Sequence, residues 1–137
     1  MLICDTHADT LWKMASREYP AGQSCDVTKE YLMNTPGVRV QALALYIPPK
    51  GMEQTPSFLE RELTAFEQLK REGWRQITSI DQAVAGEANV MLTIEGCEAF
   101  QGNPDEVNRM AALGVRMGYP LCYTNVLYPW NYPSSTE

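Results

Sequence analysis

The stretch VRVQALALYI, residues 38–47, decides the fold. It begins with alternating polar and apolar side chains and ends as a nearly continuous apolar run. Strands of a parallel sheet have this pattern because helices cover both of their faces. The residues Pro48-Pro49-Lys50-Gly51 stop the run. Residues 38–47 therefore predict a buried strand of an α/β fold.

Outward from this strand, apolar runs and helical patterns alternate along the chain. Residues 1–4 and 89–94 predict a first and a third strand, and a fourth strand begins at residue 115. Capping residues and glycines mark helices between them. The predicted helical segments are a short one from Leu11 to about Tyr19, one from the caps Asp26-Val27-Thr28 to about Met33, one from the cap Ser57 with its capping-box partner Glu60 to Gly73, one or two turns at Ser79–Val84, and one from Asn103-Pro104 to Gly114.

This order of strands and helices predicts a parallel sheet with right-handed crossovers. Four such β/α units would form half of a (β/α)8 TIM barrel, so the expected fold is a partial TIM barrel of the α/β class. An open, doubly wound sheet would give much the same pattern. No G-x-G-x-x-G or G-x-x-x-x-G-K-[ST] motif follows the first strand, so the nucleotide-binding fingerprint is missing.

The composition is that of a single globular domain. Of the 137 residues, 45% are hydrophobic and 20% are charged, and the formal net charge is -6. Because no run of Lys and Arg occurs, neither nucleic acid nor an anionic membrane is expected as a partner. The start of the chain lacks the pattern of a signal peptide, and the longest apolar run, residues 42–49, is too short to span a bilayer. We therefore expect a soluble, cytoplasmic protein.

The cysteines do not indicate a structural zinc site. The chain has four of them, no C-x-x-C pair and a single histidine, so reduced thiols are the simpler expectation. The four positions are Cys4, Cys25, Cys97 and Cys122.

The single histidine, His7, lies between two carboxylates near the start of the chain, in MLICDTHADTLW. If the first strand continues past Cys4, side chains alternate between its faces, and Asp5, His7 and Asp9 share one face. An imidazole nitrogen and a carboxylate oxygen could then approach one divalent cation from the same side. The alternative is a solvated strand end in which His7 is an ordinary surface residue or pairs with Asp9.

Glu95 directly follows the apolar third strand and precedes Gly96, which allows a sharp turn. In parallel α/β folds the reactive groups gather at the carboxyl ends of the strands, where His7 and Asp9 also lie. An unpaired carboxylate in a partly dry barrel mouth is costly, so a cation or a strong donor is expected nearby. The alternative is a loop residue that points to water.

These residues carry a resemblance to a known family. DTHADTLW at the start, Leu-Tyr-Ile-Pro-Pro after the second strand, TIEG at residues 93–96 and LGVR at residues 113–116 resemble the renal or membrane dipeptidases, and most closely their bacterial, cytosolic branch. These are zinc-dependent peptidases with amidohydrolase-like barrels. Ile77-Thr78-Ser79 also matches. The resemblance covers roughly residues 1–116 and corresponds to the N-terminal half of the family's barrel.

The resemblance implies a site and a reaction. His7 and Asp9 would bind one zinc ion, and Glu95 would be a catalytic residue that bridges this ion to a second one. The two ions would share a hydroxide that attacks the peptide bond of a dipeptide, some of which carry a D-residue at the carboxyl end. Asp5 matches the opening motif but is given no ligand role; it is expected to orient His7 or the strand end.

The chain departs from the family in two ways. Family members are much longer, and their later strands bring two histidines for the second zinc ion, which this chain lacks, so that site is incomplete. The end of the chain also diverges. Pro120 removes a backbone donor from the fourth strand. The family usually has His or Trp followed by Asn directly after this strand, whereas Trp130-Asn131 comes later in the chain. The expected domains are therefore a barrel half at residues 1–116 and a divergent, irregular tail at residues 117–137.

Three functions remain open from the sequence. The first is a truncated zinc dipeptidase with little activity of its own. The second is a non-catalytic α/β binding or assembly module that keeps the family's strands, and the third is a related metal hydrolase that acts on a non-peptide amide. Because a half-barrel leaves unpaired edges at its first and fourth strands, a homodimer or a complementing fragment is the expected partner, beside the dipeptide substrate.

Overall fold

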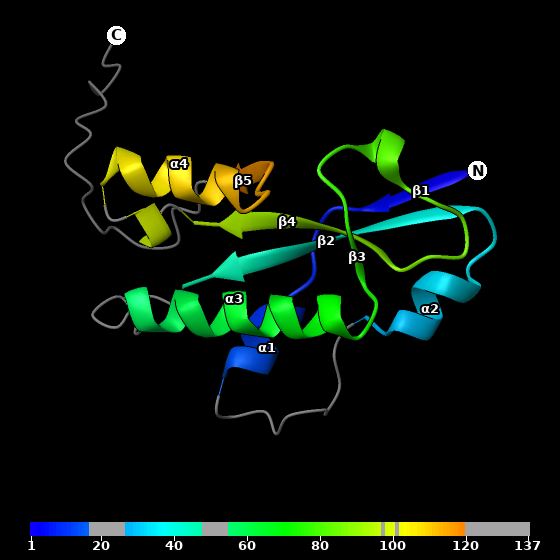
Figure 1. The fold of residues 1–137 in the computed structure, drawn as a ribbon, viewed down its shortest axis with the longest axis horizontal. Coiled ribbons are helices and arrows are strands. Elements are labelled where there is room, and N and C mark those ends of the chain that lie inside the picture. Colours follow the sequence, from blue (N-terminus) through cyan, green and yellow to red (C-terminus); the bar gives the residue numbers. More distant parts are fainter. Residues whose placement is uncertain (17–26, 48–54, 97, 101, 120–137) are drawn as a thin grey trace, which may run out of the picture.

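The strand β2 (Val38–Tyr46) lies in the middle of a parallel sheet that curls into a half-barrel (Figure 1). The computed structural model describes residues 1–16, 27–47, 55–96, 98–100 and 102–119. On one side β2 pairs with β1 (Leu2–Asp5), and on the other with β4 (Asn89–Glu95). The short strands β3 (Arg75–Gln76) and β5 (Met117–Tyr119) pair with the beginning and the end of β4. All four pairings are parallel, as the sequence predicted.

Helices connect the strands and cover one face of the sheet (Figure 1). Within the described residues they are α1 (Thr10–Ala15), α2 (Lys29–Asn34), α3 (Thr55–Arg71) and α4 (Pro104–Ala112), with 3-10 turns η2 (Ile80–Gln82) and η3 (Glu98–Phe100). None of the helices in these ranges is long and apolar enough to cross a membrane. The alternation of strands and helices and the four parallel pairings confirm the α/β class and the parallel sheet. The half-barrel is compatible with part of an α/β barrel.

The two faces of the sheet have different neighbours. Leu43 and Leu45 of β2 and Leu92 of β4 belong to the main core, which also contains apolar side chains of α1, α3 and α4. Val40 and Met91 belong to a smaller cluster on the opposite, inner face. Because side chains alternate along a strand, every second residue of β4 faces inward, and Glu95 follows Met91 in this series.

Two predicted helix starts are confirmed and one is wrong. The side chain of Thr28 accepts a hydrogen bond from the amide of Tyr31 at 3.1 Å, and that of Asn103 accepts one from the amide of Asp105 at 3.0 Å. The third helix begins at Thr55, before the predicted cap. Ser57 therefore lies inside the first turn, and the Glu60 carboxylate pairs with Arg109 of α4 at 3.0 Å.

The first strand does not continue to residue 9, so Asp5, His7 and Asp9 do not share one face of an extended strand. β1 ends at Asp5, and the chain runs through irregular backbone into α1 at Thr10. The strand β3 was not predicted, because two residues carry no periodic signal. The first three residues of the predicted tail form β5, and residues 120–137 lie outside the described residues. So do Cys25, Cys97 and Cys122, while Cys4 is an exposed free thiol.

Candidate metal centre

His7, Asp9 and Glu95 lie together at the carboxyl ends of β1 and β4. Nε2 of His7 is 3.1 Å from Oδ1 of Asp9 and 3.2 Å from Oε2 of Glu95. One ligand atom from each of the three residues lies within 4.8 Å of the others. The structure therefore brings together all three residues that the sequence marked as metal ligands.

The exposure of these side chains suits a site at the mouth of the half-barrel. The side chains of His7 and Asp9 are 43% and 45% exposed, and that of Glu95 is 18% exposed. Burial raises the pKa of the Glu95 carboxyl above its ordinary value; the imidazole of His7 opposes this shift and the carboxylate of Asp9 adds to it. A carboxylate held in this way is stabilised by any cation that approaches it.

The backbone around His7 is fixed by four hydrogen bonds. The amide of His7 donates to Oδ1 of Asp5 at 3.2 Å, so Asp5 orients the start of the loop. Nε2 of Gln41 donates to the carbonyl oxygen of His7 at 3.1 Å. The carbonyl oxygen of Ala8 accepts from the amide of Ala44 at 3.0 Å, and that of Asp9 accepts from the amide of Lys13 in α1 at 3.0 Å. His7 and Asp9 therefore approach each other because the chain is held in a turn, not because a strand continues.

The three side chains contact one another and also form a cluster that could hold a metal ion. A neutral imidazole has one N–H, and Nε2 of His7 faces two carboxylate oxygens, so its proton cannot be aligned well with both. Around a tetrahedral zinc ion, ligand atoms about 2.1 Å from the metal lie roughly 3.4 Å from one another. The two separations from Nε2 of His7, 3.1 and 3.2 Å, are close to this value, and all three ligand atoms lie within 4.8 Å of one another. One nitrogen and two carboxylate oxygens form a donor set that zinc and related cations accept.

Two buried polar residues near the site were missed by the sequence analysis. Gln41 interrupts the apolar run of β2, which is a visible signal, and its side chain is fully buried. Glu62 is also fully buried, and its signal is subtler. It replaces an apolar residue in the series Leu59, Phe66 and Leu69, whose spacing marks the buried face of α3.

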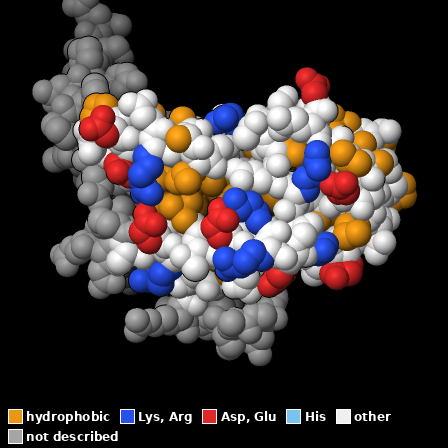
Figure 2. All heavy atoms as spheres, viewed as in Figure 1, with side chains coloured by type: hydrophobic (Ala, Val, Ile, Leu, Met, Phe, Trp, Pro, Cys, Tyr) orange, Lys and Arg blue, Asp and Glu red, His pale blue; other side chains and the backbone are white. Residues whose placement is uncertain are grey.

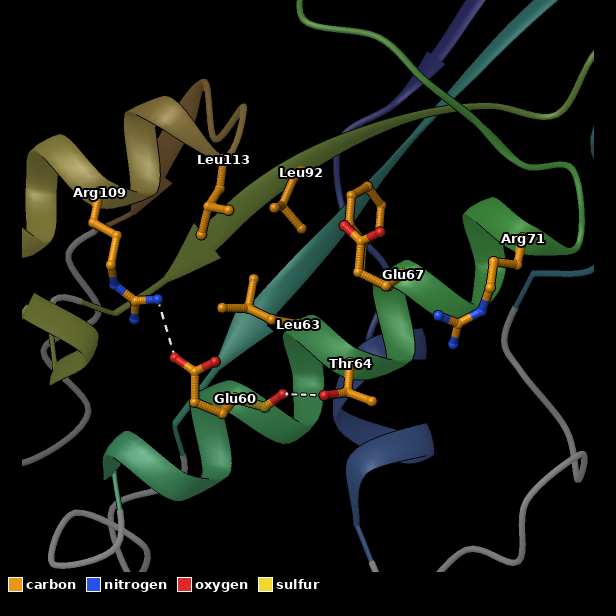
Figure 3. A pocket seen from close by; sticks show the side chains of 9 residues that line it. Glu60, Leu63, Thr64, Glu67, Arg71, Leu92, Arg109 and Leu113 are labelled. Carbon is orange, nitrogen blue, oxygen red and sulfur yellow. Dashed lines mark hydrogen bonds and ion pairs between the residues drawn. The ribbon is translucent and has the colours of Figure 1, made fainter.

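A separate pocket lies between α3 and α4, on the helix-covered face of the sheet. Leu63, Leu92 and Leu113 line its apolar part, and the Arg109–Glu60 ion pair closes one end (Figure 3). Figure 2 shows apolar side chains gathered among charged ones over these two helices. Since Leu92 and Glu95 point to opposite faces of β4, this pocket is not part of the metal centre.

Comparisons of this chain with protein-family models and with curated proteins gave no match.

Proposed function

We propose that this chain is a metal-binding half of an amidohydrolase-like TIM barrel, with His7, Asp9 and Glu95 as ligands of one zinc ion. The observation that supports this most strongly is the position of Nε2 of His7 between two carboxylate oxygens, at 3.1 and 3.2 Å. A bound zinc ion would activate water and polarise a carbonyl group there. The three residues would hold the ion, and the fixed backbone of residues 7–9 would keep two of them in place.

The resemblance of the sequence motifs to renal and membrane dipeptidases favours a dipeptide as the substrate. In that family two zinc ions act together, and here the second set of histidines is lacking. Glu95 would be the carboxylate that contacts both ions in a complete site. We therefore propose that residues 1–137 bind one ion and hydrolyse dipeptides slowly or not at all unless further strands complete the barrel.

The free edges of the sheet support a partner that adds strands. In the described residues β1 has a neighbour on one side only, and β5 pairs only with β4. An unpaired edge presents backbone donors and acceptors that another strand can satisfy. A second copy of this chain or a complementing fragment would supply them, and light scattering at micromolar concentration distinguishes such a dimer from a monomer.

Zinc calorimetry on the metal-free chain tests the proposal. We expect His7→Ala and Glu95→Gln each to weaken binding at least about tenfold. Glu30→Gln makes the same chemical change at an exposed position on α2 and should leave the affinity unchanged. If the wild type does not bind zinc, or if neither ligand variant weakens the binding, the chain is instead the non-catalytic α/β module that the sequence left open.

A further inference from the structure

Glu62 is a fully buried carboxyl group in the middle of α3, where its neighbours along the same face are Leu59 and Phe66. Burial raises its pKa well above the ordinary value, which the amide of Tyr46 and the nearby guanidinium of Arg61 partly oppose. Glutamates are almost never fully buried unless they are paired, because removing a carboxylate from water is costly. No ion pair to Glu62 occurs within the described part of the chain.

The carboxyl group of Glu62 is used at only one of its two oxygens. Oε1 accepts a hydrogen bond from the amide of Tyr46, the last residue of β2, at 3.1 Å. Oε2 is buried and has no hydrogen-bond partner among the residues that the structure describes. A side chain that combines one hydrogen bond with one unsatisfied buried oxygen contributes little to stability, since an apolar side chain of similar size would avoid the desolvation. Its place therefore calls for another explanation.

The position of this hydrogen bond along β2 provides one. The amides of Ala44 and Tyr46 lie on the same edge of β2, two residues apart, beyond the point where β1 has ended. The first donates to the carbonyl oxygen of Ala8, and the second donates to Glu62. Two residues of a strand span about 7 Å. The carboxyl group of Glu62 therefore follows Ala8 directly along the edge of β2, beside the loop that carries His7 and Asp9.

Tyr46, the donor of this hydrogen bond, lies beside the third ligand residue, Glu95. Tyr46 is the register partner of Glu95, and both residues end their strands. Asp9 also acts on Glu62 electrostatically and raises its pKa, which is consistent with their proximity. Beyond the end of β1, the edge of β2 has no neighbouring strand among the described residues. The side chain of Glu62 accepts the hydrogen bond there instead, between the His7–Asp9 loop and the end of β2, which lies beside Glu95.

We propose that Glu62 is a positioning residue of the metal centre, which fixes the end of β2 and the loop of residues 7–9 through the hydrogen bond from Tyr46. The metal-binding part of this inference rests on the proposed function. The positioning part concerns the metal-free chain as well, so the two can be tested separately. Because the hydrogen bond needs an acceptor and no charge, glutamine should be able to replace glutamate here.

Amide hydrogen exchange in the metal-free chain tests the positioning. In Glu62→Met, exchange at Tyr46 and at Ala44 should accelerate about tenfold more than exchange at Leu92, which reports the core of β4. Glu62→Gln should restore protection at both amides. Phe66→Leu, one turn away on the same face of α3, is the matched control that lowers stability without affecting the two amides selectively. If Glu62→Met accelerates Tyr46 but leaves Ala44 protected, the carboxyl does not position the loop and the inference fails.

Zinc titration of the same variants tests the consequence. We expect Glu62→Met to bind zinc about tenfold or more weakly, Glu62→Gln to recover most of the affinity, and Phe66→Leu to stay within about twofold of the wild type. Wild-type affinity in Glu62→Met overturns the link to the metal centre. Absence of zinc binding in the wild type defeats the proposed function instead, and the exchange data then decide the positioning alone. If Glu62→Met does not fold, Glu62→Asp, which withdraws the acceptor by one methylene, replaces it in both measurements.

Discussion

Nε2 of His7, in the loop after β1, lies 3.2 Å from Oε2 of Glu95 at the end of β4, although β2 lies between these two strands in the sheet. Neighbouring strands are about 4.8 Å apart, so the side chains must meet over the inner face of β2. The residues of β2 that share this face with Glu95 include Ala42 and Ala44, which are both small. We infer that their small size leaves room for His7 and Glu95 to approach each other.

Ala44→Val should therefore separate the ligands. The added methyl groups lie beside Thr93, the register partner of Ala44, directly below the level of Glu95. We expect zinc affinity to fall about tenfold and stability to fall by about 1–3 kcal/mol from overpacking. Ala42→Val, one step farther from the site on the same face, should lower stability similarly and leave zinc affinity unchanged. Equal zinc affinities of the two variants in calorimetry would contradict the explanation.

Gln41→Leu should lower the zinc affinity by releasing the backbone of His7. The variant keeps the approximate size of the side chain but removes the donor to the carbonyl oxygen of His7. Partners that hold a ligand loop typically contribute about 10–100-fold to metal affinity. We expect a loss of zinc affinity in this range, together with new chemical shifts for the His7 ring in NMR spectra. Unchanged His7 signals would mean that the turn holds itself without Gln41.

The stability of the metal-free chain should decrease as the pH rises above about 4.5, the ordinary pKa of a glutamate. The raised pKa of Glu62 means that the folded state keeps a proton that the unfolded chain has already lost. The free energy of unfolding therefore falls until the pH has passed the folded-state pKa. Urea unfolding at a series of pH values measures this slope, and Glu62→Gln should flatten it.

Part of the slope should remain in Glu62→Gln, because burial also raises the pKa of Glu95. The two carboxyl groups act in the same direction. A double variant, Glu62→Gln with Glu95→Gln, should remove the contribution of both. A slope as steep in Glu62→Gln as in the wild type would show that Glu62 does not titrate in this range.

Asn89→Ala should lower the stability of the chain without a direct effect on the metal site. The buried side chain of Asn89, at the start of β4, donates to the carbonyl oxygens of Arg39, Val84 and Glu87 and accepts from the amide of Val84. Leaving these groups unsatisfied should lower the free energy of unfolding by about 3 kcal/mol. Thermal unfolding measures the loss, and zinc affinity below the unfolding temperature should match that of the wild type.

The sequence by itself determined the elements with long, regular patterns. β2 and β4 follow from apolar runs that are typical of buried strands. The starts of α2 and α4 follow from Thr28 and Asn103, whose side chains accept hydrogen bonds from amides two or three residues further along the chain. It also indicated His7, Asp9 and Glu95, because polar ligand residues that directly follow strands are placed at one edge of a parallel sheet.

Only the tertiary structure decided how these residues meet. The end of β1 at Asp5, the curl of the sheet and the hydrogen bond between Glu62 and Tyr46 depend on contacts between segments far apart in the chain, and no local pattern encodes them. The amide of Tyr46 illustrates the reason. Once β1 leaves the edge of β2, a buried donor must find an acceptor elsewhere, and which side chain provides it depends on how α3 packs.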